Sequence, residues 1–207
     1  MNIGVLASHE GTTLQAIIDA CATGTLPAQV VAVISNNRDS GALQRARVAS
    51  VAAYHLSSQT HAEPEALDAA ICSALVERRV DVVVLAGYMK KLGAQTLARF
   101  RGRILNTHPA LLPKFGGKGM YGLDVHRAVL AAREATTGAS VHLVTEDYDA
   151  GPVIAQCEVP VATTDTPEAL ARRVQERERA LVVEVLAAIA AGRLHLPAGA
   201  DNDGAYG

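Results

Sequence analysis

Apolar residues along the first half of the chain follow two alternating patterns. Short runs of β-branched and aliphatic residues, typical of buried strands, are followed by longer segments whose apolar positions recur every three to four residues, as in amphipathic helices. This alternation predicts strands at residues 3–7, 30–34, 52–56, 81–85 and 103–106, and helices at 12–22, 40–49 and 64–79. Strands that alternate with helices form right-handed crossovers, so we expect an α/β fold with a Rossmann-like, mostly parallel sheet and helices on both faces.

The pattern changes after residue 110. Two strands, 139–144 and 152–161, are separated by a segment too short for a crossover helix, so we expect an antiparallel pair near the C-terminal side of the sheet. One helix is expected before this pair, at 123–134, and a long one after it, from Thr166 to about Ala190. We expect a single domain over residues 1–194 and a flexible tail over 195–207, where the hydrophobic pattern ends.

Composition and charge exclude several classes of protein. The chain has 207 residues, with 19 Lys plus Arg against 21 Asp plus Glu, and this near-neutral balance without a basic block argues against a nucleic-acid partner. The three widely spaced cysteines indicate neither a disulfide framework nor a zinc site. The most apolar segment, 181–191, is shorter than the ~18 residues that a membrane span needs. We therefore expect no membrane association and a cytoplasmic protein.

The first strand-to-helix turn, residues 7–13, presents free backbone N–H groups at a helix N-terminus, which favours an anion such as phosphate. A dinucleotide is not favoured, because the turn lacks the G-x-G-x-x-G fingerprint and the second strand ends in Ser35-Asn36-Asn37, without an acidic residue to hold a ribose. A bound monophosphate is the functional interpretation. The structural alternative is that Thr12 or Thr13 only caps the helix.

Asn106, His108 and Asp149 are candidates for acid–base chemistry. Asn106 and His108 share one face of a strand at the carboxyl edge of the sheet, where α/β proteins bind ligands, and Pro109 holds His108 in an extended conformation. An amide beside an imidazolium stabilises a developing oxyanion. Asp149 lies in the loop between the two late strands, and its carboxylate is expected to raise the pKa of His108. A structural histidine and an ordinary turn aspartate are the alternatives.

Three segments, residues 82–89, 104–113 and 140–154, resemble the phosphoribosylglycinamide formyltransferase family, the folate-dependent enzymes of purine synthesis. The most specific parts are the Asn-x-His-Pro-x-Leu-Leu-Pro stretch from Asn106 to Pro113 and the Asp-x-Gly-Pro turn that begins at Asp149. The likeness extends from residue 1 to about 193. It implies transfer of a formyl group from 10-formyltetrahydrofolate, as co-substrate, to the amine of phosphoribosylglycinamide, without a metal.

The resemblance also implies roles for individual residues. Asn106 would hold the formyl oxygen, His108 would act as general acid, and Asp149 would keep His108 charged and help, through water, to remove the proton of the attacking amine. The ribonucleotide would contact Gly11, Thr12, Thr13, Pro109, Gln175 and Glu178. The folate would contact Met89, Lys90, Lys91, Leu92, Asn106, Thr145, Glu146, Asp147, Tyr148 and Asp149. His142 either lines the same region or faces the core.

The chain departs from the family pattern at three places. In the first turn, His9 stands where the family has its first Gly and Thr13 where it has Asn; a glycine there would adopt positive φ at less cost. Pro64 falls where many relatives place a folate-contacting Arg. Lys90 replaces a frequent Arg, which keeps the charge but loses the planar fork. The glycine-rich loop at 115–119 either brings Lys118 to a ligand or has no ligand role.

Other functions remain open at this stage. A formyltetrahydrofolate hydrolase, or a formyltransferase for amino sugars or charged tRNA, generally carries a further domain, for which we expect no room in this chain. A non-catalytic folate- or nucleotide-binding relative is the alternative from another class, and the intact trio argues against it. We expect small-molecule partners only, and either a monomer or a homodimer.

Overall fold

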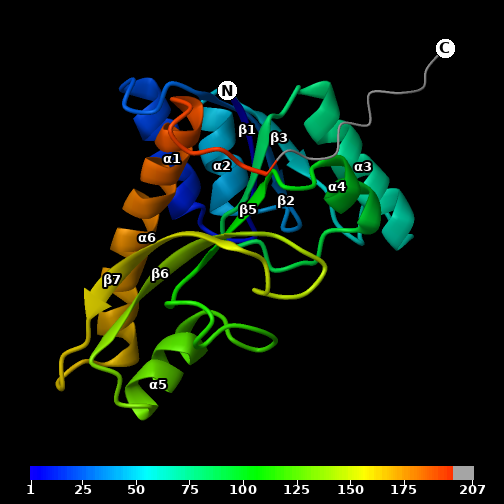
Figure 1. Ribbon diagram of the computed structural model, residues 1–207. Coiled ribbons are helices and arrows are strands. Elements are labelled where there is room, and N and C mark those ends of the chain that lie inside the picture. Colours follow the sequence, from blue (N-terminus) through cyan, green and yellow to red (C-terminus); the bar gives the residue numbers. More distant parts are fainter. Residues whose placement is uncertain (198–207) are drawn as a thin grey trace.

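A computed structural model describes residues 1–197 as a seven-stranded sheet flanked by helices (Figure 1). The strands are β1 (Asn2–Leu6), β2 (Gln29–Ser35), β3 (Ala52–His55), β4 (Val82–Leu85), β5 (Ile104–His108), β6 (Thr136–Leu143) and β7 (Val153–Pro160). The helices are α1 (Thr12–Ala22), α2 (Gly41–Val48), α3 (Pro64–Glu77), α4 (Ala94–Arg99), α5 (Leu123–Ala131) and α6 (Pro167–Ala190). The seven strands and the helices α1, α2, α3, α5 and α6 agree with the predicted elements, with small differences at their ends.

The strand order is β3-β2-β1-β4-β5-β6-β7. The first five strands in this order are parallel, whereas β6 is antiparallel to both β5 and β7. The expected α/β fold, with its parallel sheet and late antiparallel pair, is confirmed. β6 begins at Thr136 and not at 139, because Gly138 continues the strand: a Cβ there would lie 1.9 Å from the carbonyl oxygen of Cys157, so only glycine allows β7 to come this close.

Helices cover both faces of the sheet. Alternate side chains of β4 point to opposite faces, so that Val82 and Val84 join one core cluster while Val83 and Leu85 join another. The first cluster packs against α1, α2 and α6, and the second against α3 (Figure 1). Burial on both faces explains why this strand reads as an uninterrupted apolar run.

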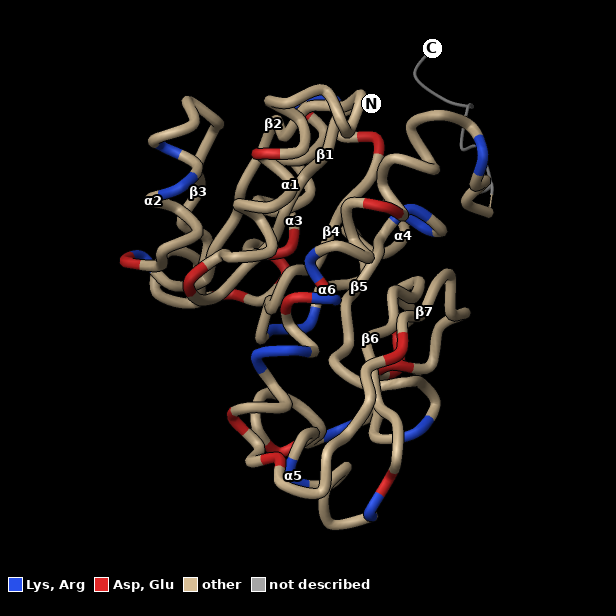
Figure 2. Tube along the Cα trace, turned by 90° about the vertical axis from the view of Figure 1, so that its left-hand side faces the viewer, with Lys and Arg blue, Asp and Glu red and all other residues tan. Residues whose placement is uncertain are grey.

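Three loops meet at the carboxyl edge of the parallel strands: 86–93 after β4, 109–122 after β5, and 144–152 between β6 and β7. Basic and acidic residues are interspersed along the trace (Figure 2). Of the expected tail, 195–207, only the first three residues are described, and the carbonyl oxygen of Pro197 lies beside Gly102. None of the helices within residues 1–197 is both long enough and apolar enough to cross a membrane.

Candidate functional site

The antiparallel register of β5 and β6 assembles a polar cluster. It places His142 opposite Asn106, and the ring Nε2 of His142 lies 3.1 Å from the amide Nδ2 of Asn106. The loop after β6 brings in Asp149, whose carboxylate lies 3.5 Å from His108 Nδ1 and 3.4 Å from His142 Nε2. The structure therefore brings Asn106, His108 and Asp149 together as expected and adds His142. His142 was expected either to line this region or to face the core, and it lines the cavity beside the cluster.

Asp149 depends on an unusual backbone conformation. Its φ of 52° lies in the left-handed region, which Asp and Asn tolerate better than most residues. The turn is tight, because a Cβ at Gly151 would lie 1.8 Å from the carbonyl oxygen of Leu143. This conformation directs the Asp149 carboxylate inward, where only 12% of the side chain remains exposed.

The glycine-rich loop after β5 contacts both His108 and Asp149. His108 donates from Nε2 to the carbonyl oxygen of Phe115 at 2.7 Å, and the N–H of Gly117 donates to Asp149 Oδ2 at 2.9 Å. Gly117 has a φ of 96°, which a side chain would oppose. Sequence reasoning gave this loop no such role. Lys118, which was considered for a ligand contact, is exposed.

Burial and charge act in opposite directions on His108. Burial lowers the pKa of His108 below its usual value, and the Asp149 carboxylate and the Phe115 carbonyl offset this only in part. The Asp149 carboxylate thus acts in the expected direction, but the net pKa of His108 is lowered, because the imidazole is almost fully removed from water. For Asp149, burial alone would raise the pKa, but hydrogen bonds from His142 and Gly117 and the nearby imidazoles leave it below its usual value.

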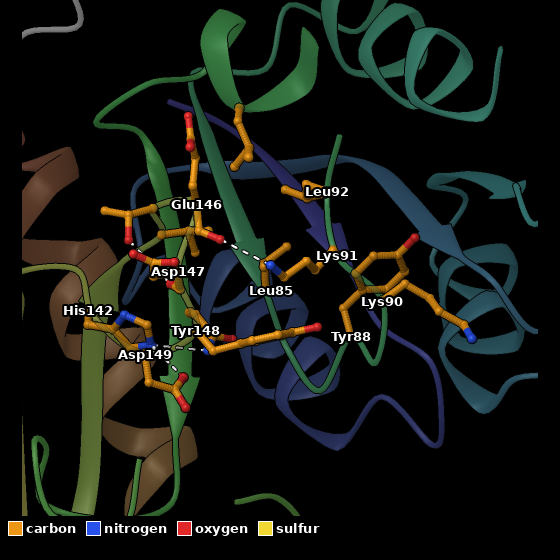
Figure 3. A pocket seen from close by; sticks show the side chains of 14 residues that line it. Leu85, Tyr88, Lys90, Lys91, Leu92, His142, Glu146, Asp147, Tyr148 and Asp149 are labelled. Carbon is orange, nitrogen blue, oxygen red and sulfur yellow. Dashed lines mark hydrogen bonds and ion pairs between the residues drawn. The ribbon is translucent and has the colours of Figure 1, made fainter. Parts of the chain in front are cut away.

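A cavity opens beside this cluster, between the 86–93 and 144–149 segments (Figure 3). All the residues assigned to the folate line it except Met89, which is half-exposed at the surface. His142 also lines it, and the sequence reading missed four further lining residues: Leu85, Tyr88, Leu97 and Val144. Burial raises the pKa of Tyr88 to about 12, so its phenol stays neutral. The cavity is thus apolar on one side and polar towards Asn106 and Asp149.

Lys91 joins the two walls of this cavity. Its Nζ donates to the carbonyl oxygen of Glu146 at 3.2 Å and lies 4.5 Å from the centre of the Tyr148 ring (Figure 3). Lys90 and Pro64 line a second cavity on the other side of the same segment. Among residues 1–197 no arginine lines either cavity, whereas Lys90 and Lys91 line both.

The first turn leaves backbone donors free at the N-terminus of α1. The N-cap residue is Gly11, at φ 69°, and no side chain accepts a hydrogen bond from the first turn of the helix. The alternative in which Thr12 or Thr13 is the cap is therefore wrong. Gly11 is required, because a Cβ would lie 2.7 Å from Ala42 Cα. His9 is not among the positive-φ residues, so its replacement of a glycine causes no backbone strain.

Ser8 links this turn to the cavity wall. Its hydroxyl donates to Asn36 Oδ1 at 2.5 Å and accepts from the N–H of Met89 at 2.8 Å. The position of the turn is thereby coupled to the 86–93 segment.

Glu178 on α6 approaches β5 from the opposite face. Burial raises the pKa of the Glu178 carboxyl, and its interaction with the Thr107 side chain opposes that rise. Gln175 lies about one turn earlier on α6 and is exposed, while Pro109 follows the end of β5. The residues assigned to the ribonucleotide therefore lie on the first turn, the end of β5 and α6.

Comparison with known proteins identifies the family. The formyl transferase family model matches residues 1–186. Phosphoribosylglycinamide formyltransferase of Escherichia coli is 42% identical over 196 residues, which covers 95% of this chain and 90% of that protein. The Mycobacterium tuberculosis protein of the same name is 44% identical, over 90% of this chain and 83% of its own length.

Solved structures agree with these relatives. The crystal structure of glycinamide ribonucleotide transformylase 1 from Symbiobacterium toebii superimposes with a TM-score of 0.87 at 42% identity, covering 95% of this chain and 90% of that one. The chain therefore belongs to the formyl transferase family, as an enzyme that transfers one-carbon groups.

Proposed function

We propose that this enzyme transfers the formyl group of 10-formyltetrahydrofolate to the amine of phosphoribosylglycinamide, a step of de novo purine biosynthesis. The observation that carries the proposal is the position of the Asn106–His108–Asp149 cluster, which lies between the cavity and the residues of the first turn and α6. The names of the relatives at 42% and 44% identity support the same reaction.

The reaction needs two substrates held together and one developing charge stabilised. The amine attacks the formyl carbon, and the carbonyl oxygen becomes a tetrahedral oxyanion. Asn106 lines the cavity, and its Nδ2 donates to the oxyanion. No covalent enzyme intermediate is required.

Proton transfer completes the reaction. The amine loses a proton to Asp149 through water, and His108 supplies a proton to the leaving folate nitrogen as the carbon–nitrogen bond breaks. Since burial lowers the pKa of His108, the protonated form depends on the carboxylate of Asp149. Turnover that requires this form decreases as the pH rises above the pKa of His108.

The two ends of the site suit the two substrates. The free N–H groups at the start of α1 suit a phosphate group, and Glu178 suits ribose hydroxyls. The cavity, with an apolar wall at Leu85 and Leu92 and polar atoms in the loop 145–149, suits a pterin ring. Lys90 and Lys91 provide positive charge for the carboxylates of the folate.

The first prediction concerns the reaction itself. The purified chain should release tetrahydrofolate from 10-formyltetrahydrofolate only when phosphoribosylglycinamide is added. The release is measured by the absorbance of the folate product. Release without any acceptor would identify a hydrolase, and release that requires an amino sugar would identify the corresponding transferase. Folate binding without release under any of these conditions would identify a non-catalytic relative.

The second prediction concerns His108. We expect His108→Ala to lower kcat by about 10²- to 10⁴-fold, the usual contribution of a general acid, while the affinity for the ribonucleotide changes little. His195→Ala removes an exposed imidazole far along the chain and is the control, with an expected kcat near that of the wild type. A His108→Ala variant with near-normal turnover would remove His108 from the mechanism.

The third prediction concerns the coupling of Asp149 to His108. Asp149→Asn removes the charge that opposes burial, so the pKa of His108 should fall further, and its imidazole resonances should titrate at lower pH by NMR. Asp147→Asn removes an exposed carboxylate from the same loop and should leave the titration unchanged. An unaltered or higher pKa of His108 in the Asp149 variant would show that the two groups are not coupled.

The fourth prediction concerns the glycine loop. Gly117 and Gly119 have φ of 96° and 90°, with no atom near a would-be Cβ, so alanine strains both backbones similarly. Only the Gly117 N–H donates to Asp149. We expect Gly117→Ala to lower kcat by about 10- to 100-fold, because a small misplacement of a catalytic group is costly, and Gly119→Ala to have little effect. Equal losses in both variants would argue against a positioning role for this hydrogen bond.

A further inference from the structure

A third cavity lies along α1, between α2 and α6. The residues that line it come from these three helices: Thr12, Gln15, Ala16, Asp19, Arg45 and Arg179. Thr12 is the first residue of α1, so one end of the cavity reaches the free backbone donors described above. Two arginines thus border the place where the proposed function puts a phosphate group.

Arg45 is held against the first turn. Its Nε donates to the carbonyl oxygen of Glu10 at 2.8 Å, and its Nη1 donates to the side-chain oxygen of Gln15 at 3.0 Å. Gln15 in turn donates to Asp19, the one acidic side chain in this lining. Arg45 therefore braces the turn that precedes α1 and adds positive charge behind it.

Arg179 is the less constrained of the two. It follows Glu178 directly and lies four residues after Gln175, so it shares a helix face with Gln175. Its side chain is half-buried, and within residues 1–197 no carboxylate forms an ion pair with it. A half-buried guanidinium that forms no close ion pair among the described residues, in a cavity that also reaches Thr12 at the start of α1, is well placed for an external anion.

We propose that Arg179 binds the phosphate group of the substrate and that Arg45 positions the turn that completes this site. The inference rests on the proposed function and extends it by naming a residue that selects phosphorylated acceptors. The backbone donors of a helix N-terminus and a guanidinium are complementary for a phosphate, since the first donate along the helix axis while the second pairs with two oxygens at once. No first-turn acidic residue opposes this charge in α1.

The test separates the phosphate contact from catalysis. In Arg179→Gln we expect KM for phosphoribosylglycinamide to rise by about 10- to 100-fold, the range of one charge-assisted hydrogen-bond pair, while kcat and KM for the folate stay within about twofold. For the unphosphorylated glycinamide riboside, wild type and variant should react equally. Arg177→Gln is the matched control, because it removes the same charge from an exposed position of α6 that does not line the cavity.

Binding of ribose 5-phosphate, measured by calorimetry, tests the site without turnover. We expect Arg179→Gln to weaken it at least tenfold, Arg179→Lys to retain part of the affinity, and Arg177→Gln to match the wild type. Unchanged binding in Arg179→Gln, or equal losses at 177 and 179, would overturn the inference even if the wild type catalyses the transfer. Failure of the wild type to transfer formyl, with the expected loss in phosphate binding, would instead overturn only the proposed reaction.

Discussion

The buried charge of Asp149 is the constraint on which the arrangement of the site depends. A carboxylate largely removed from water needs donors or positive charge close by, and Asp149 obtains them from three separate segments: the end of β5, the end of β6 and the loop after β5. Because His108, His142 and Gly117 all contact the same carboxylate, displacement of one segment alters the environment of the others. The geometry of the whole cluster therefore depends on the contacts of this one carboxylate.

The contacts between Asp149 and the two imidazoles also influence which of these groups carries a proton. One carboxylate lies between two imidazoles, so the cluster carries a net negative charge when both rings are neutral and none when one ring is protonated. Burial disfavours the protonated ring and the ionised carboxylate alike, whereas their attraction favours having both. On balance burial prevails at His108 and lowers its pKa, while the donors around Asp149 lower the pKa of that carboxyl.

Much of the fold could be predicted from residue patterns, because burial on both faces of β4 and the amphipathic spacing in α1 are local consequences of where each side chain lies. Asn106 and His108 could be proposed for a similar reason, because they lie at the carboxyl end of a parallel strand. Asp149 was added from the loop that follows β6. The roles of His142 and Gly117 could not be predicted, since they depend on the register between β5 and β6 and on the path of a loop. The net direction of the His108 pKa shift could not be predicted from the sequence either, because it depends on how deeply the ring is buried.

The direction of each side chain along β5 explains why the chemistry belongs at the edge of the sheet. Asn106 lines the cavity and His108 shares its face of the strand, while Thr107 points to the opposite face, towards α6 and Glu178. In the proposed reaction the folate and the ribonucleotide therefore approach from opposite faces of one strand, which the backbone of the sheet keeps apart. They can meet only beyond the last residues of β5, where Pro109 ends the pairing. His108, the final residue of that strand, lies at this edge beside Asp149.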